Sequence, residues 1–125
     1  MPRPSNTEER RAQIVDGLIA VMARQGYERA SVAAIAAEAH LVPGLVHYHF
    51  ESKLEILLAL VEVLHARLRE RTARLLAGVD PEDPHARLAA FLDAHVATGT
   101  GADPQAVACW VAIAAEAVRE PGGFV

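Results

Sequence analysis

Apolar residues recur at helical spacing along the first part of the chain. One face carries Ile14, Leu18, Val21 and Met22, with Val15 and Ile19 beside them. Glu8 and Glu9 precede this face, at a place where the dipole of a helix N-terminus favours negative charge. Gly26 stands where a glycine commonly ends a helix. The pattern therefore predicts a helix over residues 7–25.

Two short helices are expected next. Ser31 is a favourable N-cap for a helix over residues 32–39. Pro43 is tolerated in the first turn of a further helix, over residues 43–50, because its missing N–H would have no partner there. Residues 40–42 form the tight turn between them. This arrangement predicts a helix-turn-helix unit, whose second helix enters the major groove of DNA.

Three more helices complete the pattern. Ser52, with Glu55 three residues later, predicts the start of a long helix whose leucine stripe continues to residue 76. A fifth helix is expected over residues 85–97 and a sixth over residues 104–120. One side of the fifth carries Leu88, Phe91, Leu92 and either His95 or Val96. No alternation of strand period competes with these patterns, so the predicted fold is all-α.

The composition excludes several classes of protein. Of the 125 residues, 52% are apolar and 22% are charged, which favours a packed core over disorder. Cys109 is the only cysteine, so neither an intrachain disulfide nor a cysteine-built zinc site is expected. No apolar run reaches the ~20 residues that cross a bilayer. We therefore expect a cytoplasmic protein without a membrane partner or a cofactor.

The net charge of −4 does not decide whether the chain binds nucleic acid, because its distribution matters more than its sum. Residues 1–53 hold six Lys or Arg and six Asp or Glu, whereas residues 54–125 hold six Arg and ten acids. The predicted helix-turn-helix unit is therefore neutral. Such a unit binds DNA if its few cations face the phosphates.

The second helix of this unit carries side chains suited to reading DNA. Pro43 and Gly44 are small, so the start of the helix can approach the base edges. His47, Tyr48 and His49 have hydrogen-bonding groups of the length needed for phosphates or bases. Tyr48 serves equally well at the edge of the core. The apolar residues expected to pack inward are Leu41, Val46 and Phe50.

The histidines invite a metal-binding interpretation. However, His47 and His49 stand two residues apart on a helix and point to nearly opposite sides, so they cannot chelate one ion. No metal site is expected. If either histidine contacts phosphate instead, protonation should strengthen the complex, and operator affinity should rise as the pH falls from about 8 towards 6.

In these segments the chain resembles the TetR (tetracycline-repressor-like) family. The matching residues, in order and without gaps over roughly residues 7–60, are Gly26-Tyr27, Ser31-Val32-Ala33-Ala34-Ile35-Ala36, Gly44-Leu45-Val46-His47-Tyr48-His49-Phe50 and Ser52-Lys53. The resemblance implies a DNA-binding head over residues 1–52 and a helical regulatory and dimerisation body over residues 53–125. It also implies a homodimeric, ligand-responsive repressor whose partners are a palindromic double-stranded DNA operator and a small-molecule inducer.

Roles for single residues follow from the same resemblance. Ser31 matches a phosphate-contacting cap, and Lys53 matches a phosphate-binding lysine that opens the fourth helix. Base-facing positions are matched by Pro43, Gly44 and Leu45, and positions on the DNA backbone by His47 and His49. The members normally continue through about three more helices, so the body is expected to be incomplete.

Three positions depart from the family's pattern. His40 stands where glycine is common, and a turn with positive φ would make histidine mildly unfavourable. Val42 stands where Ser or Thr often caps the reading helix. Leu45 replaces a frequent Thr and favours contact with a thymine methyl group over a hydrogen bond. These changes bear on the operator sequence and leave the predicted fold unchanged.

A ligand cavity is expected in the body by the same resemblance. Candidate lining residues are Phe91, His95, Cys109, Trp110 and Glu116, although a residue of each kind, taken alone, is more often an ordinary part of the core. No nucleophile accompanies Asp93 and His95, so catalysis is not expected. The alternative function is a helical interaction and dimerisation module that no longer binds DNA. A salt titration on operator DNA separates the two.

Overall fold

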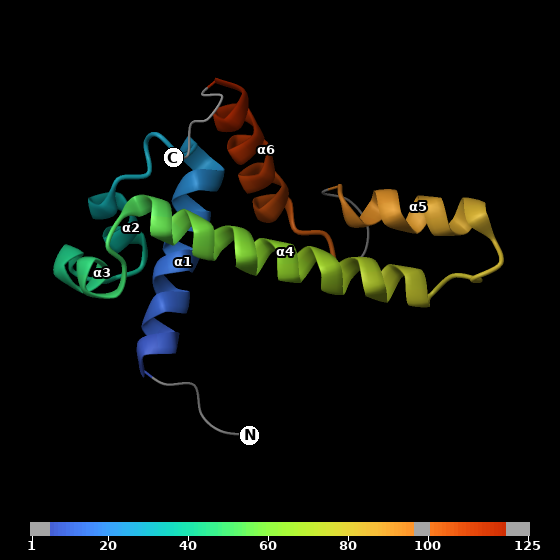
Figure 1. Cartoon of the computed structure of the whole chain (residues 1–125), viewed down its shortest axis with the longest axis horizontal. Coiled ribbons are helices and arrows are strands. Elements are labelled where there is room, and N and C mark those ends of the chain that lie inside the picture. Colours follow the sequence, from blue (N-terminus) through green and yellow to red (C-terminus); the bar gives the residue numbers. More distant parts are fainter. Residues whose placement is uncertain (1–5, 97–100, 120–125) are drawn as a thin grey trace.

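The computed structural model describes residues 6–96 and 101–119, and these residues contain six helices and no strand. The helices are α1 (Asn6–Gln25), α2 (Val32–Glu38), α3 (Pro43–His49), α4 (Lys53–Ala77), α5 (Pro84–Ala94) and α6 (Pro104–Arg119). The all-α prediction is confirmed. In Figure 1, α1–α3 cluster around the start of α4, and α5 returns antiparallel along the second half of α4. Helix α6 begins near the middle of α4 and runs away from it.

The helix starts follow the capping residues. The hydroxyl oxygens of Ser31 and Ser52 accept hydrogen bonds from backbone N–H groups three residues later, at 3.1 and 3.2 Å. Glu55 completes the cap of α4 by accepting from the N–H of Glu51 at 2.6 Å, one residue before the donor that a capping box would use. The sequence therefore predicts where α2 and α4 begin, because a cap is a local interaction.

Helix α5 begins and ends earlier than predicted. Asp83 caps it by accepting from the N–H of Ala86 at 3.1 Å, so Pro84 occupies its first turn. It ends at Ala94, where the N–H of His95 donates to the carbonyl of Leu92 at 3.0 Å. The predicted ends of the fifth and sixth helices, residues 97 and 120, lie outside the described residues.

One hydrophobic cluster, centred on α1, joins α1 to α2, α3, α4 and α6. Its buried members are Ile14, Val15, Leu18, Ile19, Val21, Met22, Ala30, Ile35, Ala36, Val46, Phe50, Ile56, Leu57, Leu60, Leu64, Ala106 and Cys109. Gly17 lets α2 approach α1 closely, since a Cβ there would lie 2.9 Å from the carbonyl oxygen of Ile35. The predicted domain boundary after residue 52 thus falls inside continuous packing, which extends into α4 and α6.

The pair of α4 and α5 is packed more thinly. Helix α5 buries only the small side chains of Ala90 and Ala94 against its neighbours. Its large apolar residues, Leu88, Phe91, Leu92 and the following Val96, are between 43% and 58% exposed. The buried Arg71 of α4 donates to the carbonyl of Asp93 at 2.9 Å and so fastens the end of α5. None of the described helices combines the length and apolar character needed to cross a membrane.

Candidate DNA-binding site

The turn between α2 and α3 is a tight, left-handed one. His40 has φ of 58°, the conformation that normally favours glycine. Around it, the N–H of His40 donates to the carbonyl of Ala37 at 3.2 Å, and the N–H of Leu41 donates to that of Ala36 at 2.9 Å. These two bonds form the motif that commonly ends a helix with a glycine. The positive φ expected at His40 is therefore confirmed.

The start of α3 has no side-chain cap. Val42 occupies the N-cap position with extended backbone, and no side-chain hydrogen bond reaches the first turn from it. Pro43 follows in that turn and has no N–H to satisfy. Val42 therefore leaves α3 without the side-chain cap that Ser or Thr would supply, and the backbone amides at the start of α3 keep their capacity to bond a ligand.

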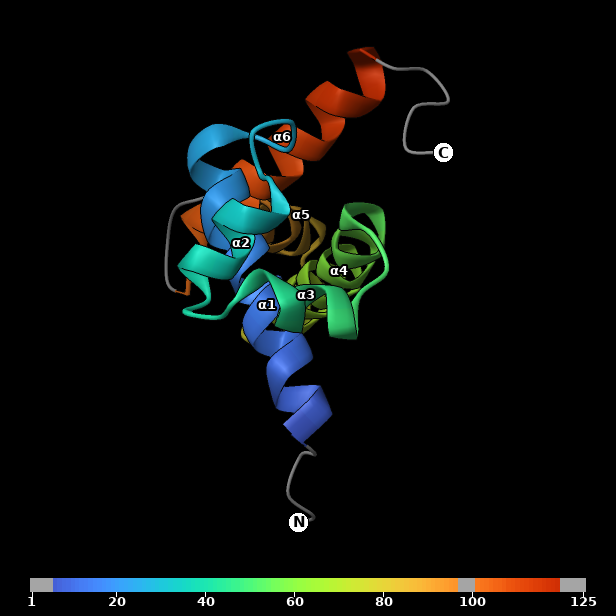
Figure 2. The ribbon, with the colours of Figure 1, turned by 90° about the vertical axis from the view of Figure 1, so that its left-hand side faces the viewer.

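Helix α3 has one buried side and one exposed side. Val46 is 1% exposed and Phe50, just after the helix, is 2% exposed, so both anchor α3 in the core as predicted. The exposed residues are Pro43, Gly44, Leu45, His47 and Tyr48. Tyr48 is 80% exposed, which excludes the core-edge alternative for this side chain. Figure 2 shows α2 and α3 packed beside α1, whose N-terminal turns project beyond them.

Two side chains of α1 fix the position of α3. Arg11 donates from Nη1 to the carbonyl oxygen of His49 at 2.7 Å, and its guanidinium carbon lies 4.1 Å from the centroid of the Phe50 ring. Gln13 donates from Nε2 to the carbonyl of Ala39 at 2.6 Å, at the end of α2. Sequence reasoning missed both roles, because their partners are backbone atoms 38 and 26 residues away.

Lys53 opens α4 but is already engaged within the chain. Its Nζ donates to the carbonyl oxygen of Tyr27 at 2.9 Å and lies 4.0 Å from the centroid of the Tyr27 ring. The side chain is half-buried, and this desolvation lowers the pKa of Lys53 below its ordinary value. The cation therefore holds α4 against the loop between α1 and α2. Its contact residue, Tyr27, lies four residues before Ser31, the exposed N-cap of α2.

Another cation of this end of the molecule is neutralised locally. Arg24 donates to both carboxylate oxygens of Glu38, at 3.3 and 3.0 Å. The hydrogen bond and charge of Arg24 hold the pKa of Glu38 below its usual range. This pair spans α1 and α2 and leaves Arg24 a weak candidate for a phosphate contact. Within residues 6–96 and 101–119, no three His, Cys, Asp or Glu side chains gather as a metal site would require.

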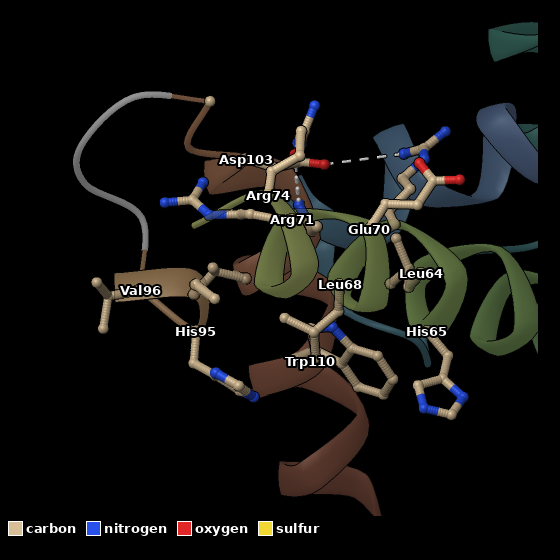
Figure 3. Close-up of a pocket in the computed structure, with 15 residues that line it drawn as sticks. Leu64, His65, Leu68, Glu70, Arg71, Arg74, His95, Val96, Asp103 and Trp110 are labelled. Carbon is tan, nitrogen blue, oxygen red and sulfur yellow. Dashed lines mark hydrogen bonds and ion pairs between the residues drawn. The ribbon is translucent and has the colours of Figure 1, made fainter. Parts of the chain in front are cut away.

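A cavity of about 420 Å³ lies among α4, α5 and α6. Figure 3 shows Leu64 and Leu68 of α4 and Trp110 of α6 around it, with His95 and Val96 at the end of α5. Its charged lining residues are Arg67, Arg71 and Arg74 together with Glu70 and Asp103. A volume of this size, with mostly apolar walls and a few polar groups, falls in the range common for small-molecule pockets.

The five predicted ligand-site residues separate in the structure. His95 and Trp110 line the cavity, and Phe91 lines a second groove between α4 and α5 together with His95. Cys109 instead faces α1, where its Sγ contacts the carbonyl oxygen of Ile19 at 3.4 Å. Burial raises the pKa of the Cys109 thiol to about 11. Glu116 pairs with Arg119 at 2.6 Å near the end of α6 and does not line either hollow.

Comparisons with known proteins place the helix-turn-helix in a family. Residues 14–60 match the family described as bacterial regulatory proteins, tetR family. The HTH-type transcriptional regulator BetI of Yersinia pestis (strain Pestoides F) is 30% identical over 125 residues, covering 97% of this chain. Residues 14–60 form a tetR-family domain, and most of the chain is similar to regulators of this kind. The TetR-family match extends from the middle of α1 into α4 and so includes all of α2 and α3.

Two further relatives delimit the similarity. BetI of Rhizobium meliloti (strain 1021) is 31% identical over 120 residues, which cover 95% of this chain and 57% of that protein. The regulator CymR of Pseudomonas putida is 32% identical over 75 residues, which cover 60% of this chain and 37% of that protein. The chain spans 61% of the length of the Yersinia relative. All the residues that line the cavity lie beyond residues 14–60, which match the family.

Proposed function

We propose that the chain is the DNA-reading part, with an adjoining part of the regulatory body, of a ligand-responsive transcriptional repressor. The observation that carries this proposal is the two-sided build of α3. Val46 and Phe50 hold the helix in the core, while Gly44, Leu45 and His47 face outward. A short helix presented in this way fits the major groove. The relatives named as HTH-type transcriptional regulators support the proposal. The protein would act in the cytoplasm and would not catalyse a reaction.

Each exposed group has a proposed task. Pro43, Gly44 and Leu45 would face base edges, and the uncapped amides at the start of α3 add donors there. The phosphate contacts would come from Ser31, His47, His49, Tyr48 and Lys53. His47 and Tyr48 are the more exposed of these on α3, whereas His49 is half-buried. The base contacts would set the sequence preference, and the phosphate contacts would set the overall affinity.

We infer that the operator is palindromic and that a homodimer binds it. Two heads related by a two-fold axis reach successive major grooves only at a separation of about 34 Å. The exposed side of α5, formed by Leu88, Phe91 and Leu92, is the surface that we assign to the second copy. Sedimentation of the chain over a range of concentrations tests this assignment. Leu92→Glu should lower the dimer fraction, while Leu58→Glu, at an exposed leucine of α4, serves as the matched control.

The cavity supports control by a small molecule. Its walls include α4, which also carries Lys53 at its start, so a ligand that alters α4 would change the spacing of the two heads. Induction then requires that the ligand bind the DNA-incompetent arrangement more tightly than the competent one. Three Arg against two acidic residues in the lining favour an organic molecule with an apolar body and a negative charge.

The ligand assignment has its own test. An aryl-alkanoate and its uncharged amide are compared for their ability to raise the melting temperature of the chain. The carboxylate should stabilise more, and Arg74→Gln should remove that difference, because Arg74 makes no ion pair within the described residues. Equal effects of the two compounds on the wild type would contradict an anionic ligand while leaving DNA binding unaffected.

The decisive test of DNA binding is selection from a random duplex library followed by a salt titration. A regulator should enrich an inverted repeat, and its log affinity should fall linearly and steeply with log salt. Lys53→Ala should weaken binding to all sequences alike and make the salt slope shallower by about one contact. A chain that enriches no sequence and shows no salt-dependent binding would be the interaction module instead.

A further inference from the structure

The cations around the helix-turn-helix differ in whether the chain already engages them. The structure describes five Lys and Arg side chains in residues 6–53. Four of them donate to other groups of the chain: Arg10, Arg11, Arg24 and Lys53. The fifth, Arg29, is exposed, and its guanidinium makes no hydrogen bond, ion pair or ring contact within residues 6–96 and 101–119. Its charge is therefore available to an anion from outside the chain.

Hydrogen bonds hold the backbone on both sides of Arg29. The N–H of Ala30 donates to the carbonyl oxygen of Tyr27 at 3.1 Å, and the N–H of Ser31 donates to that of Arg29 at 3.0 Å. Ala30 has no exposed surface and anchors the loop in the core. The turn thus fixes the base of the Arg29 side chain, so only the rotamers of this side chain lose freedom when it binds.

The loop that carries Arg29 lies on the same side of the molecule as α3. In Figure 1 the loop, in light blue, leaves the end of α1 towards α2 and α3, and in Figure 2 it faces the viewer together with them. Arg29 stands two residues before Ser31, so their Cα atoms are at most about 7 Å apart. Because each DNA strand presents a phosphate about every 3.4 Å of helix axis, Arg29 can reach a phosphate beside the one proposed for Ser31.

The acidic neighbour of Arg29 is paired with another helix. Glu28 precedes Arg29 in the loop, and its carboxylate lies 3.7 Å from the guanidinium of Arg119 on α6. The charge of Arg29 is therefore not cancelled by the adjacent residue. Arg24 differs in this respect, because it donates to both carboxylate oxygens of Glu38. An anion that approaches the loop meets an uncompensated cation.

We propose that Arg29 contacts the phosphate backbone of duplex DNA, next to the contact proposed for Ser31. The assignment rests on the proposed DNA-binding function and adds a cation to its phosphate contacts. A guanidinium matches a phosphate with two parallel N–H donors. Arg29 gives up no contact within the described residues when it binds, whereas Lys53 must leave the carbonyl oxygen and the ring of Tyr27.

The test compares Arg29→Gln with the wild-type chain on the selected operator and on an unrelated duplex, over a range of salt concentrations. Binding to both duplexes should weaken by about threefold to fivefold per head, the size of one exposed ion pair. The plot of log affinity against log salt should become shallower by about 0.9 per head, the value for one neutralised phosphate. Arg29→Lys keeps the charge and should retain the wild-type slope. A slope for Arg29→Lys as shallow as that of Arg29→Gln would contradict a charge contact.

The matched control is Arg69→Gln on α4. Arg69 is also exposed, and its guanidinium too makes no hydrogen bond or ion pair within the described residues. It lies 16 residues after Lys53 on the same helix, about 24 Å along the axis. Its effect on operator affinity should stay below about twofold, because exposed charges more than ~10 Å apart are largely screened at 0.1 M salt. An equal loss in both variants would show a general charge effect and overturn the proposal.

Unfolding in urea gives a second readout. Neither Arg29→Gln nor Arg69→Gln removes a contact that holds the chain together, so each should unfold at the wild-type urea concentration. A lower midpoint for Arg29→Gln alone would assign the guanidinium to the fold and would overturn its contact with phosphate.

A Lys53→Ala background tests whether the two cations contact separate phosphates. Arg29→Gln should weaken binding there by the same factor as in the wild type, because independent contacts add. If its effect disappears in that background, Arg29 acts only through Lys53 and the proposal is wrong.

The outcomes also separate this contact from the proposed function. A wild-type chain that binds no selected duplex would overturn both. A wild-type chain that binds its operator, with Arg29→Gln equal to it in affinity and salt dependence, would overturn the role of Arg29 alone. Weaker binding to both duplexes and a shallower salt slope, confined to Arg29→Gln, are the results that support it.

Discussion

The head and α5 are both amphipathic in sequence, yet only the head buries its apolar residues within the chain. Ile14, Leu18 and Ile35 have no exposed surface, because α1, α2, α3 and α4 cover one another. On α5 the large residues Leu88 and Phe91 remain 58% and 48% exposed, and alanines make the contact with α4. Helical periodicity identifies the apolar side of a helix. Whether that side is covered depends on which other elements are present to pack against it.

The largest expected effect comes from one substitution made in both regions. Phe50→Ala should lower the free energy of unfolding by about 3–5 kcal/mol, because it empties a site in the core. It also removes the ring that Arg11 covers. At concentrations where the chain is monomeric, Phe91→Ala should cost under ~1 kcal/mol, since half of that ring is exposed in the single chain. Urea unfolding of both variants gives the two values. Similar losses of unfolding free energy would contradict the difference in packing between the head and α5.

A second pair of variants tests how closely the head is packed. Gly17→Ala places a Cβ 2.9 Å from the carbonyl oxygen of Ile35, so α1 and α2 must separate, at a cost of about 1–3 kcal/mol. Gly44→Ala is the control, since no atom lies within 4 Å of its added Cβ. It should leave the stability unchanged or slightly higher. If Gly17→Ala unfolds at the wild-type urea concentration, the approach of the two helices is looser than described.

The pH dependence of stability tests whether α6 belongs to the packed region. The thiol of Cys109 has a pKa of about 11 in the fold against an ordinary 9.0, so the unfolded chain loses this proton first as the pH rises. Stability should therefore fall between pH 9 and 11, by about 2 kcal/mol at about 1.4 kcal/mol per pKa unit. Cys109→Ala should lack this part of the loss. Parallel profiles for the two proteins would mean that the thiol is not buried against α1.

The smallest expected effect lies at the weakest point of the head. Val42 is 63% exposed at an uncapped N-terminus whose backbone already has the extended form of a cap residue. Val42→Thr should therefore raise the free energy of unfolding by up to about 1 kcal/mol by supplying the missing acceptor. The same change at the exposed Val111 within α6 offers no such gain and serves as its control. A shift of the urea midpoint in the control alone would contradict the capping argument.

Local rules predicted much of this structure. Caps at Ser31 and Ser52 and the turn over residues 40–42 each depend on a few neighbouring residues, and all are present. The predicted end of α5, residue 97, was wrong by about three residues, because no glycine or proline directly follows Ala94 to mark the end of the helix.

Contacts between distant segments could not be predicted in the same way. Nothing in the sequence around Arg11 indicates the carbonyl of His49, and nothing around Lys53 indicates that of Tyr27. For the body, apolar spacing could not tell which side of α6 faces the cavity. Trp110 lines that cavity, whereas the neighbouring Cys109 packs on α1. The DNA contacts themselves remain predictions from the resemblance and from the exposure of α3.

The central claim is that α3 reads DNA sequence, and Leu45→Thr tests it most directly. Leu45 is 37% exposed on the outward side of α3, so the change adds a hydroxyl with little loss of packing. Wild type and variant are measured on the selected operator and on every single base-pair change within one half-site. We predict that the preference changes at one or two adjacent base pairs, by about 1–3 kcal/mol, and is unchanged elsewhere. An identical preference profile for the two proteins would contradict the assignment of α3 as the reading helix.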